Sequence, residues 1–290
     1  MNHLEFEQEM HDYIHASYEE FMVYQNIVNS ILDEFHRVCK SNDIEYFVGF
    51  GSLLGLVRDN GNIPWDYDVD VIVPIDLREK LIKTLETDLS KDYYYVYKNN
   101  TKHYPTSCLR VCKKGYSYMA LHVDVFFLMG CPNHKHSIKK FIKRVNWAYR
   151  ARQTHNARFH LETSYKTRFK QIFSYIYSYV FFPIGENLLS KFEDHLYFKY
   201  PLKNSEKCMI FYLWNHTYST SCFRTSKNLQ IGSRTLSVPI DADTFLTEQY
   251  GDYKSYLPIS NRFEEFYKMC KIVESREQYY KRCLRHNVKD

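Results

Sequence analysis

The sequence predicts an α+β fold, in which a mixed β-sheet is flanked by helices and the C-terminal part is rich in helices. Apolar residues recur at helical spacing over residues 18–40 and 77–89. Short apolar runs bounded by turn residues, notably 66–74 and 118–130, are typical of strands. From residue 134 onward the pattern becomes helical and basic. We therefore expect a catalytic core over residues 1–130, completed by a helix-rich part over 131–290 that belongs to the same compact unit.

The first half of the chain is expected to alternate between helices and strands. Its helices are amphipathic, and its breaks fall at Gly, Asn, Asp and Pro, which favour turns. In order, we expect a helix at 18–40, a strand at 44–50, a turn at Gly51 and Ser52, a short helix at 53–59, a loop at 61–64, a strand at 66–74 that Pro74 ends, a helix at 77–89, and strands at 93–98, 107–114 and 118–130.

The second half is expected to be mainly helical. Residues 134–160 carry Lys and Arg on one side and apolar residues on the other. The segment 171–185 has no charged residue, but it is too short for a comfortable membrane span and contains a proline. We expect a buried helix there. The alternative is a helix in the membrane interface, so contact between residues 137–190 and a membrane stays open. Short strands follow from about residue 200, and a last helix is expected at 261–284.

Composition narrows the class of protein. The 290 residues are 44% hydrophobic, as in globular proteins, and Lys+Arg exceeds Asp+Glu by 39 − 34 = 5. This mild excess suits an anionic ligand or membrane surface, and without a basic tail we expect no nucleic-acid partner. The 8 cysteines include no CxxC pair, so we expect reduced thiols. The N-terminus resembles no signal peptide, so a cytoplasmic location is expected, with peripheral contact at the inner face of the plasma membrane as an addition.

Three aspartates stand at alternate positions in the run "WDYDVDVIVP". On a strand, Asp66, Asp68 and Asp70 would share one face, because side chains alternate between the two faces. Three carboxylates so close repel one another, and ion pairs with Lys or Arg would explain one or two of them better than three. Divalent cations such as Mg²⁺ or Mn²⁺ cancel that repulsion and bind carboxylate oxygen. The pattern therefore favours a metal site of the kind used in phosphoryl transfer.

A fourth carboxylate stands in the apolar run "LHVDVFF". Asp124 is the one acidic residue there, and we favour a metal-binding role for it over that of a core residue hydrogen-bonded to His122 or to the backbone. Phosphate also needs donors. Gly51 and Ser52 lie where a strand is expected to meet a helix, a place where backbone N–H groups bind phosphate. Arg58 and Arg110 are candidates to neutralise a pyrophosphate, although either can be a structural arginine.

Three segments together resemble the LicD/fukutin family. They are "GSLLGLVRDNGNIPWDYDVDVIVP" at 51–74, "HVDVFFL" at 122–128 and "VPIDADTFLTEQYGDYKSYLP" at 238–258. The similarity runs over roughly residues 25–260. It implies a fold similar to that of the polymerase-beta-like nucleotidyltransferases.

The resemblance also implies an activity. Members of the family transfer a phosphoalcohol from a CDP-activated donor to a sugar hydroxyl. It places metal binding on Asp68, Asp70 and Asp124, with Asp66 nearby, and donor binding on Gly51, Ser52 and Arg58. It also suggests Asp124 as the general base, with metal binding alone as the alternative.

The expected protein is thus a magnesium-dependent transferase that moves phosphocholine from CDP-choline to a surface glycan, such as lipopolysaccharide, teichoic acid or capsule. The alternatives are transfer of ribitol, glycerol or ethanolamine phosphate, or a catalytically inactive scaffold. Trp65 is a candidate wall for a quaternary ammonium group, since aromatic faces attract such cations, or else it packs beneath its loop.

Overall fold

The computed structural model describes residues 3–258, except 64, 65, 67, 102, 103, 105, 117, 119, 120, 156–185 and 212–215, and also residues 261 and 268; side chains are described from residue 22, except those of 153–155 and 186. The helices are α1 (His3–Ser41), α2 (Phe50–Leu54), the π-helical turn η1 (Gly55–Asp59), η2 (Ile75–Leu77), α3 (Arg78–Asp88), α4 (Lys135–His155), α6 (Glu186–Tyr197), η3 (Leu202–Asn204), η4 (Thr220–Phe223) and α7 (Ala242–Tyr250). The strands are β1 (Phe47–Val48), β2 (Val69–Pro74), β3 (Tyr93–Val96), β4 (Leu109–Lys113), β5 (His122–Gly130), β6 (Lys207–Ile210), β7 (Tyr218–Ser219), β8 (Ser226–Ile231) and β9 (Arg234–Pro239).

One mixed sheet forms the centre of the described structure. Its order is β1-β2-β5-β4-β3, and β6 also pairs with β5 and carries β7 at its other edge. The pair β2 and β5 is parallel, whereas the other pairs of this sheet are antiparallel. Strands β8 and β9 form a separate hairpin. This arrangement is the α+β fold with a mixed sheet that the sequence predicts.

Strand β5 organises the sheet because it is buried along its whole length. Its first half pairs with β4 over residues 122–125, and its end pairs with β6 over 128–130. On its other side β2 pairs with it from Val69 to Pro74. A continuous apolar strand of this kind is expected where both faces of a sheet are covered.

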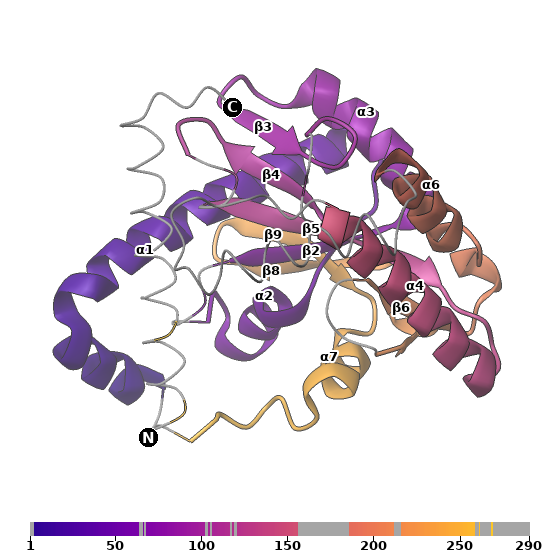
Figure 1. Ribbon diagram of the computed structural model, residues 1–290. Helices are drawn as coiled ribbons and strands as arrows, with labels where there is room; N and C mark the ends of the chain where they lie inside the picture. Colours follow the sequence, from indigo (N-terminus) through magenta and orange to yellow (C-terminus); the bar gives the residue numbers. More distant parts are fainter. Residues whose placement is uncertain are drawn as a thin grey trace, which may run out of the picture.

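Helices cover the sheet on both sides of this central strand. Helix α1 contacts β2, β4, β5 and α3, and α4 packs against α6 beside the sheet. In Figure 1, α4 and α6 lie side by side on the right of the view, on the other side of the sheet from the free end of α1. Aromatic rings link the elements: Phe50 of α2 lies edge-on to Phe126 of β5 and to Phe245 of α7, with ring centroids 5.6 and 5.9 Å apart.

The C-terminal part contributes to the same core. Strand β6 completes the central sheet, and β9 contacts β1. Phe47 of β1 packs edge-on against Phe223, with 5.3 Å between ring centroids. The chain before residue 130 is therefore packed against segments that follow residue 200.

Several expected boundaries differ from the observed ones. Helix α1 begins at His3, well before residue 18, and residues 3–17 contain no Gly or Pro to stop it. The predicted turn at Gly51 and Ser52 is wrong, because both residues lie within α2. Strand β2 begins at Val69, because its pairing with β5 starts there. Asp66 and Asp68 therefore precede the strand, and the expected strand at 66–74 is shorter than predicted.

The predicted helices at 171–192 and 261–284 fall mostly outside the described residues, so the choice between a buried and an interfacial helix at 171–185 does too. Within the described part, α6 forms the end of the first of these segments. Of the helices described, none combines the length and the hydropathy needed to span a membrane.

Candidate active site

Three charged residues stand in one row across the middle of the sheet. In the register of the strands, Asp70 of β2 is the partner of Asp124 of β5, and Asp124 is the partner of Arg110 of β4. Neighbouring strands lie ~4.8 Å apart and register partners share a face, so all three side chains project from the same face. The sequence predicted that these residues would be neighbours, and the parallel pairing of β2 with β5 brings them together.

The Asp124 carboxylate is held by the strand next to it. Arg110 donates from Nε to Oδ1 over 2.8 Å, and the Cys108 thiol donates to the same oxygen over 3.3 Å. His122 Nε2 lies 3.4 Å from the other oxygen. Burial opposes ionisation of Asp124, but His122 and Arg110 outweigh burial and lower its pKa. Asp124 is thus an ionised carboxylate within a hydrogen-bonded cluster.

Asp70 has the opposite electrostatic environment. Burial first, and then repulsion from Asp68 and Asp124, raise its pKa well above the ordinary value. Arg110 acts in the other direction but does not compensate. Of the two carboxylates in the row, Asp70 is therefore the one whose negative charge is less compensated by nearby positive charges. A cation bound beside Asp70 would relieve the most repulsion.

Asp66 and Gly51 lie against each other. A side chain at Gly51 would come within 2.6 Å of Asp66 Oδ2, so a residue with a Cβ does not fit without displacing that carboxylate. The Asp66 backbone is fixed in a turn, because its N–H donates to the Ile63 carbonyl over 3.0 Å. Gln25 of α1 donates to the carbonyl oxygens of both Ile63 and Asp66. The turn places the Asp66 carboxylate at the start of α2.

Ser52 connects α2 to the row of charges. Its Oγ accepts a hydrogen bond from the Asp70 backbone N–H over 3.0 Å. Since the hydroxyl is the acceptor in that bond, its own proton is available for a second partner. Ser52 therefore lies beside Asp70, as the predicted site requires.

Metal binding by the four aspartates stays a prediction. Their carboxylate oxygens are the donor type that Mg²⁺ and Mn²⁺ prefer. Among the described side chains, however, no group of three or more His, Cys, Asp or Glu residues is arranged to hold a metal ion. Asp124 is turned toward Arg110, and Asp66 lies against Gly51. The four carboxylates therefore have the chemistry and charge that a hard cation requires, but they do not surround a single position.

Arg58 has different partners from those of Arg110. Its guanidinium forms two hydrogen bonds with the Asp59 carboxylate, each 2.9 Å long, and stacks 4.4 Å from the Tyr256 ring. The Tyr256 hydroxyl donates to Asp59 over 2.6 Å. Arg58 thereby ties the end of η1 to the segment after α7. Trp65, the remaining predicted donor-binding residue, lies outside the described residues.

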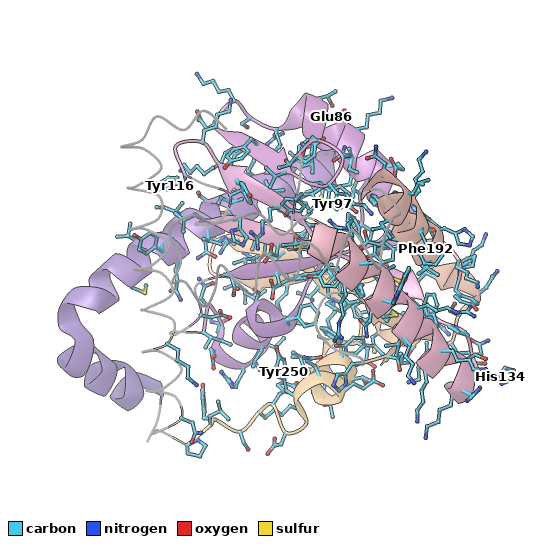
Figure 2. All side chains as sticks on the ribbon, in the orientation of Figure 1. Glu86, Tyr97, Tyr116, His134, Phe192 and Tyr250 are labelled. Carbon is cyan, nitrogen blue, oxygen red and sulfur yellow. The ribbon has the colours of Figure 1, made fainter. Side chains whose placement is uncertain are left out.

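Tyr250 is a candidate residue that the sequence-based prediction omitted. Burial first, and then the charges of Asp70 and Asp66, raise its pKa, although the residue is 42% exposed overall. Figure 2 shows Tyr250 at the end of α7. Tyr250 lies in "TEQYGDYK", which is part of the third segment that resembles the LicD/fukutin family. Its place in that segment could have identified it as a candidate from the sequence. Cys108, a further partner of Asp124, was also missed, whereas His122 is the partner expected in the alternative role of Asp124 as a core residue.

A second charged cluster supports the loop that leads into β4. The Arg152 side chain of α4 is fully buried and donates to the carbonyl oxygens of Tyr104 and Thr106, each over 2.8 Å. Arg152 also pairs with the fully buried Glu193 of α6 over 3.0 Å. This cluster connects α4 and α6 to the segment that carries Cys108 and Arg110.

Glu193 compensates more than one positive charge. Its carboxylate also accepts hydrogen bonds from Lys98, Ser107 and Tyr197, at distances between 2.6 and 2.9 Å. The Lys98 and Arg152 charges lower the pKa of Glu193 even though burial opposes ionisation. The cluster is thus a satisfied polar network in which each buried charge has opposite charges beside it.

Comparison with known proteins locates this site within a family domain. Residues 43–163 match the family described as LicD/FKTN/FKRP, nucleotidyltransferase domain. One segment of 58 residues is 40% identical to the lipopolysaccharide cholinephosphotransferase LicD of Haemophilus influenzae. That match covers 20% of this chain and 22% of the length of the LicD protein. The family match contains Asp66, Asp68, Asp70, Arg110 and Asp124.

Proposed function

We propose that this chain, whose residues 43–163 match the nucleotidyltransferase domain of the LicD/FKTN/FKRP family, belongs to that family and transfers a phosphoalcohol to a glycan. Phosphocholine is the group we favour, because a relative that matches over 58 residues is a lipopolysaccharide cholinephosphotransferase. We propose CDP-choline as the donor and a sugar hydroxyl of a surface glycan as the acceptor. The observation that carries the proposal is the register of Asp70, Asp124 and Arg110, with Asp68 and Asp66 adjacent in the chain.

The charges of the site suit a pyrophosphate donor only if a cation is also present. Asp68 and Asp70 are the residues that would hold Mg²⁺ or Mn²⁺, with Asp66 and Asp124 as further carboxylates of the same site. A bound divalent cation supplies positive charge that attracts pyrophosphate oxygens and offsets the negative charge of the transition state.

The chain's own residues have positioning roles in this proposal. Arg110 and His122 hold the Asp124 carboxylate in its ionised form. Ser52 Oγ holds the backbone of Asp70 and has a proton to donate to a phosphate oxygen. In the reaction, the acceptor oxygen forms a bond to the phosphorus that carries choline, the bond from that phosphorus to the bridging oxygen breaks, and CMP leaves with the electron pair.

The acceptor hydroxyl must lose its proton during this displacement. Asp124 remains our candidate for the general base, since it is ionised and lies beside Asp70. Its lowered pKa makes it a weak base, and this favours the alternative role of cation binding for the same residue. Transfer of ribitol, glycerol or ethanolamine phosphate uses the same arrangement and differs only in the group that the donor carries.

Release of CMP tests the proposal. The full-length protein is incubated with Mg²⁺, a glycan acceptor extract and CDP-choline, CDP-ribitol or CDP-ethanolamine in separate reactions. We expect release with CDP-choline, and at least a ~10³-fold loss for Asp68→Asn and Asp70→Asn. Asp76→Asn is the matched control, because Asp76 is exposed just after β2. Release with none of the three donors, or near-full activity of both active-site variants, would contradict the proposal. Failure to bind any CDP-alcohol, with or without Mg²⁺, would favour the inactive scaffold.

A further inference from the structure

The outer surface of α4 and α6 combines positive charge with exposed aromatic and aliphatic side chains. Four cationic side chains of α4 are exposed and recur at helical spacing, so they lie on one face of the helix; this basic face consists of Lys139, Lys140, Lys143 and Arg144. The opposite face is apolar and packs inward, where Phe141, Val145 and Ala148 are buried. Among the described residues, none of the four cations forms an ion pair with an acidic side chain.

Within the part of the chain that the structure describes, the acidic side chains of α4 and α6 whose contacts are known do not offset the charge of this surface. Residues 135–155 contain no Asp or Glu. On α6, Glu193 is buried and paired with Arg152, and Asp194 accepts hydrogen bonds from Lys98 and Arg78. Their negative charges are therefore already compensated within the protein. An exposed Lys191 adds a further positive charge beside them.

Large apolar side chains lie next to the basic face. Trp147 of α4 is 44% exposed and meets the ring of Phe192, which is 41% exposed, edge-on at 5.9 Å between centroids. Leu188, one helical turn before Phe192, is 59% exposed. These three residues form an apolar ridge where α4 and α6 meet, and Figure 2 shows Phe192 on the outside of α6.

We propose that the basic face and the apolar ridge dock this protein onto a membrane surface that contains anionic phospholipid. Lysine and arginine bind the negative head groups, and tryptophan with aliphatic residues enters the boundary between head groups and acyl chains. A nucleic acid would also match the charge, but it would leave Leu188 and the Trp147–Phe192 pair exposed to water. The combination of both features favours lipid. The proposal does not depend on the transferase activity.

Vesicle co-sedimentation of the full-length protein tests the charge component. We expect binding to vesicles of phosphatidylcholine with phosphatidylglycerol, no binding to phosphatidylcholine alone, and release at high salt. The variant with Lys139, Lys140, Lys143 and Arg144 all changed to Ser should bind at least ~100-fold more weakly, since each cation near an anionic surface contributes about 1 kcal/mol. The matched control changes the exposed Lys83, Lys91, Lys114 and Lys227 to Ser, and it should keep at least half of the wild-type partitioning.

A second pair of variants tests the apolar ridge. Leu188→Ser should weaken binding to the anionic vesicles roughly tenfold, whereas Leu257→Ser, at a residue that is 50% exposed elsewhere, should not. The proposal would be overturned if the wild type did not bind anionic vesicles, or if the control with four changed lysines lost as much vesicle binding as the basic-face variant. It would also be overturned if the wild type bound an RNA or DNA oligonucleotide but no vesicles, and the basic-face variant lost that oligonucleotide binding. Circular dichroism of each variant confirms that the fold is retained.

Discussion

At the scale of single residues, the site is defined by two aspartates with opposite environments. Asp124 has Arg110, Cys108 and His122 around it, and its pKa is lowered. Asp70, its partner in the next strand, is surrounded by carboxylates, and its pKa is raised. Perturbed pKa values of neighbouring titratable groups are common at functional sites, although structural ion pairs also produce them. The raised pKa of Asp70 implies that this residue lowers the stability of the metal-free fold.

Asp70→Asn is therefore expected to stabilise the metal-free protein at neutral pH. The unfolded chain loses the Asp70 proton near the ordinary pKa of 3.8, whereas the folded chain keeps it to higher pH. The free energy of unfolding of the wild type therefore falls as the pH rises from the pKa of Asp70 in the unfolded chain to its pKa in the folded chain. The variant lacks this carboxyl group and avoids the loss. Thermal unfolding in EDTA should show a higher midpoint by roughly 2–4 °C for each kcal/mol of repulsion removed.

Two further conditions make this experiment specific. Below pH 3.8 the wild type and the variant should converge, because Asp70 is then protonated in both states. Addition of Mg²⁺ should stabilise the wild type more than the variant. A variant that is less stable than the wild type at every pH would show that Asp70 is a structural residue.

At the scale of the elements, the site depends on helices that lie outside the catalytic strands. Arg152 of α4 and Glu193 of α6 bind one another and the loop at residues 104–107, which leads into β4. Cys108 and Arg110 follow that loop directly and contact Asp124. The helix-rich part thus supports the position of the row of charges through a buried polar network.

Glu193→Gln is expected to destabilise the fold by about 3–5 kcal/mol, because it removes the carboxylate that pairs with the fully buried Arg152. Glu206→Gln removes the same charge at an exposed position and should change stability by less than about 0.5 kcal/mol. Urea unfolding measures both. The double variant Arg152→Gln with Glu193→Gln should lose less than the sum of the single variants. Additive losses would show that the two side chains do not act as a pair.

At the scale of the whole molecule, the central sheet needs strands from both halves of the chain. Strand β6, which begins at residue 207, pairs with the end of β5, and α7 places Phe245 against Phe50. Helix α7 also contacts α2, the helix that carries Gly51 and Ser52. The expected boundary at residue 130 thus falls where β5 ends and divides elements that pack together.

A fragment of residues 1–130 is accordingly expected not to fold alone. It would expose the edge of β5 that β6 covers, and it would lose the packing of Phe223 on Phe47 and of Phe245 on Phe50. Expression of the fragment beside the full chain, followed by circular dichroism and size-exclusion chromatography, measures this. A soluble, monomeric fragment with a cooperative thermal transition would show that the first 130 residues form an independent domain.

Much of the architecture could be predicted from local patterns. The helical spacing at 77–89 and the apolar runs at 107–114 and 118–130 predicted α3, β4 and β5 to within a few residues. These signals are local because burial of one face requires a periodic sequence. The alternation at 66–74 was less reliable: it predicted three aspartates on one strand, but the strand begins at Val69, where its partner begins. Strand limits depend on pairing, and pairing is not encoded within the strand itself.

The sequence by itself determined which residues are candidates for the chemistry: the aspartates at 66, 68, 70 and 124, all within the stretch 43–163 that matches the LicD/FKTN/FKRP nucleotidyltransferase domain. The tertiary structure alone decided their environments. It gave Asp124 hydrogen bonds from Arg110 and Cys108, tied Arg58 to Asp59 and Tyr256, and buried Arg152 with Glu193. The physical reason is that the sequence specifies the type of each side chain but not its neighbours. The charge state and the partners of a side chain depend on residues that only the folded sheet and helices bring within a few ångströms.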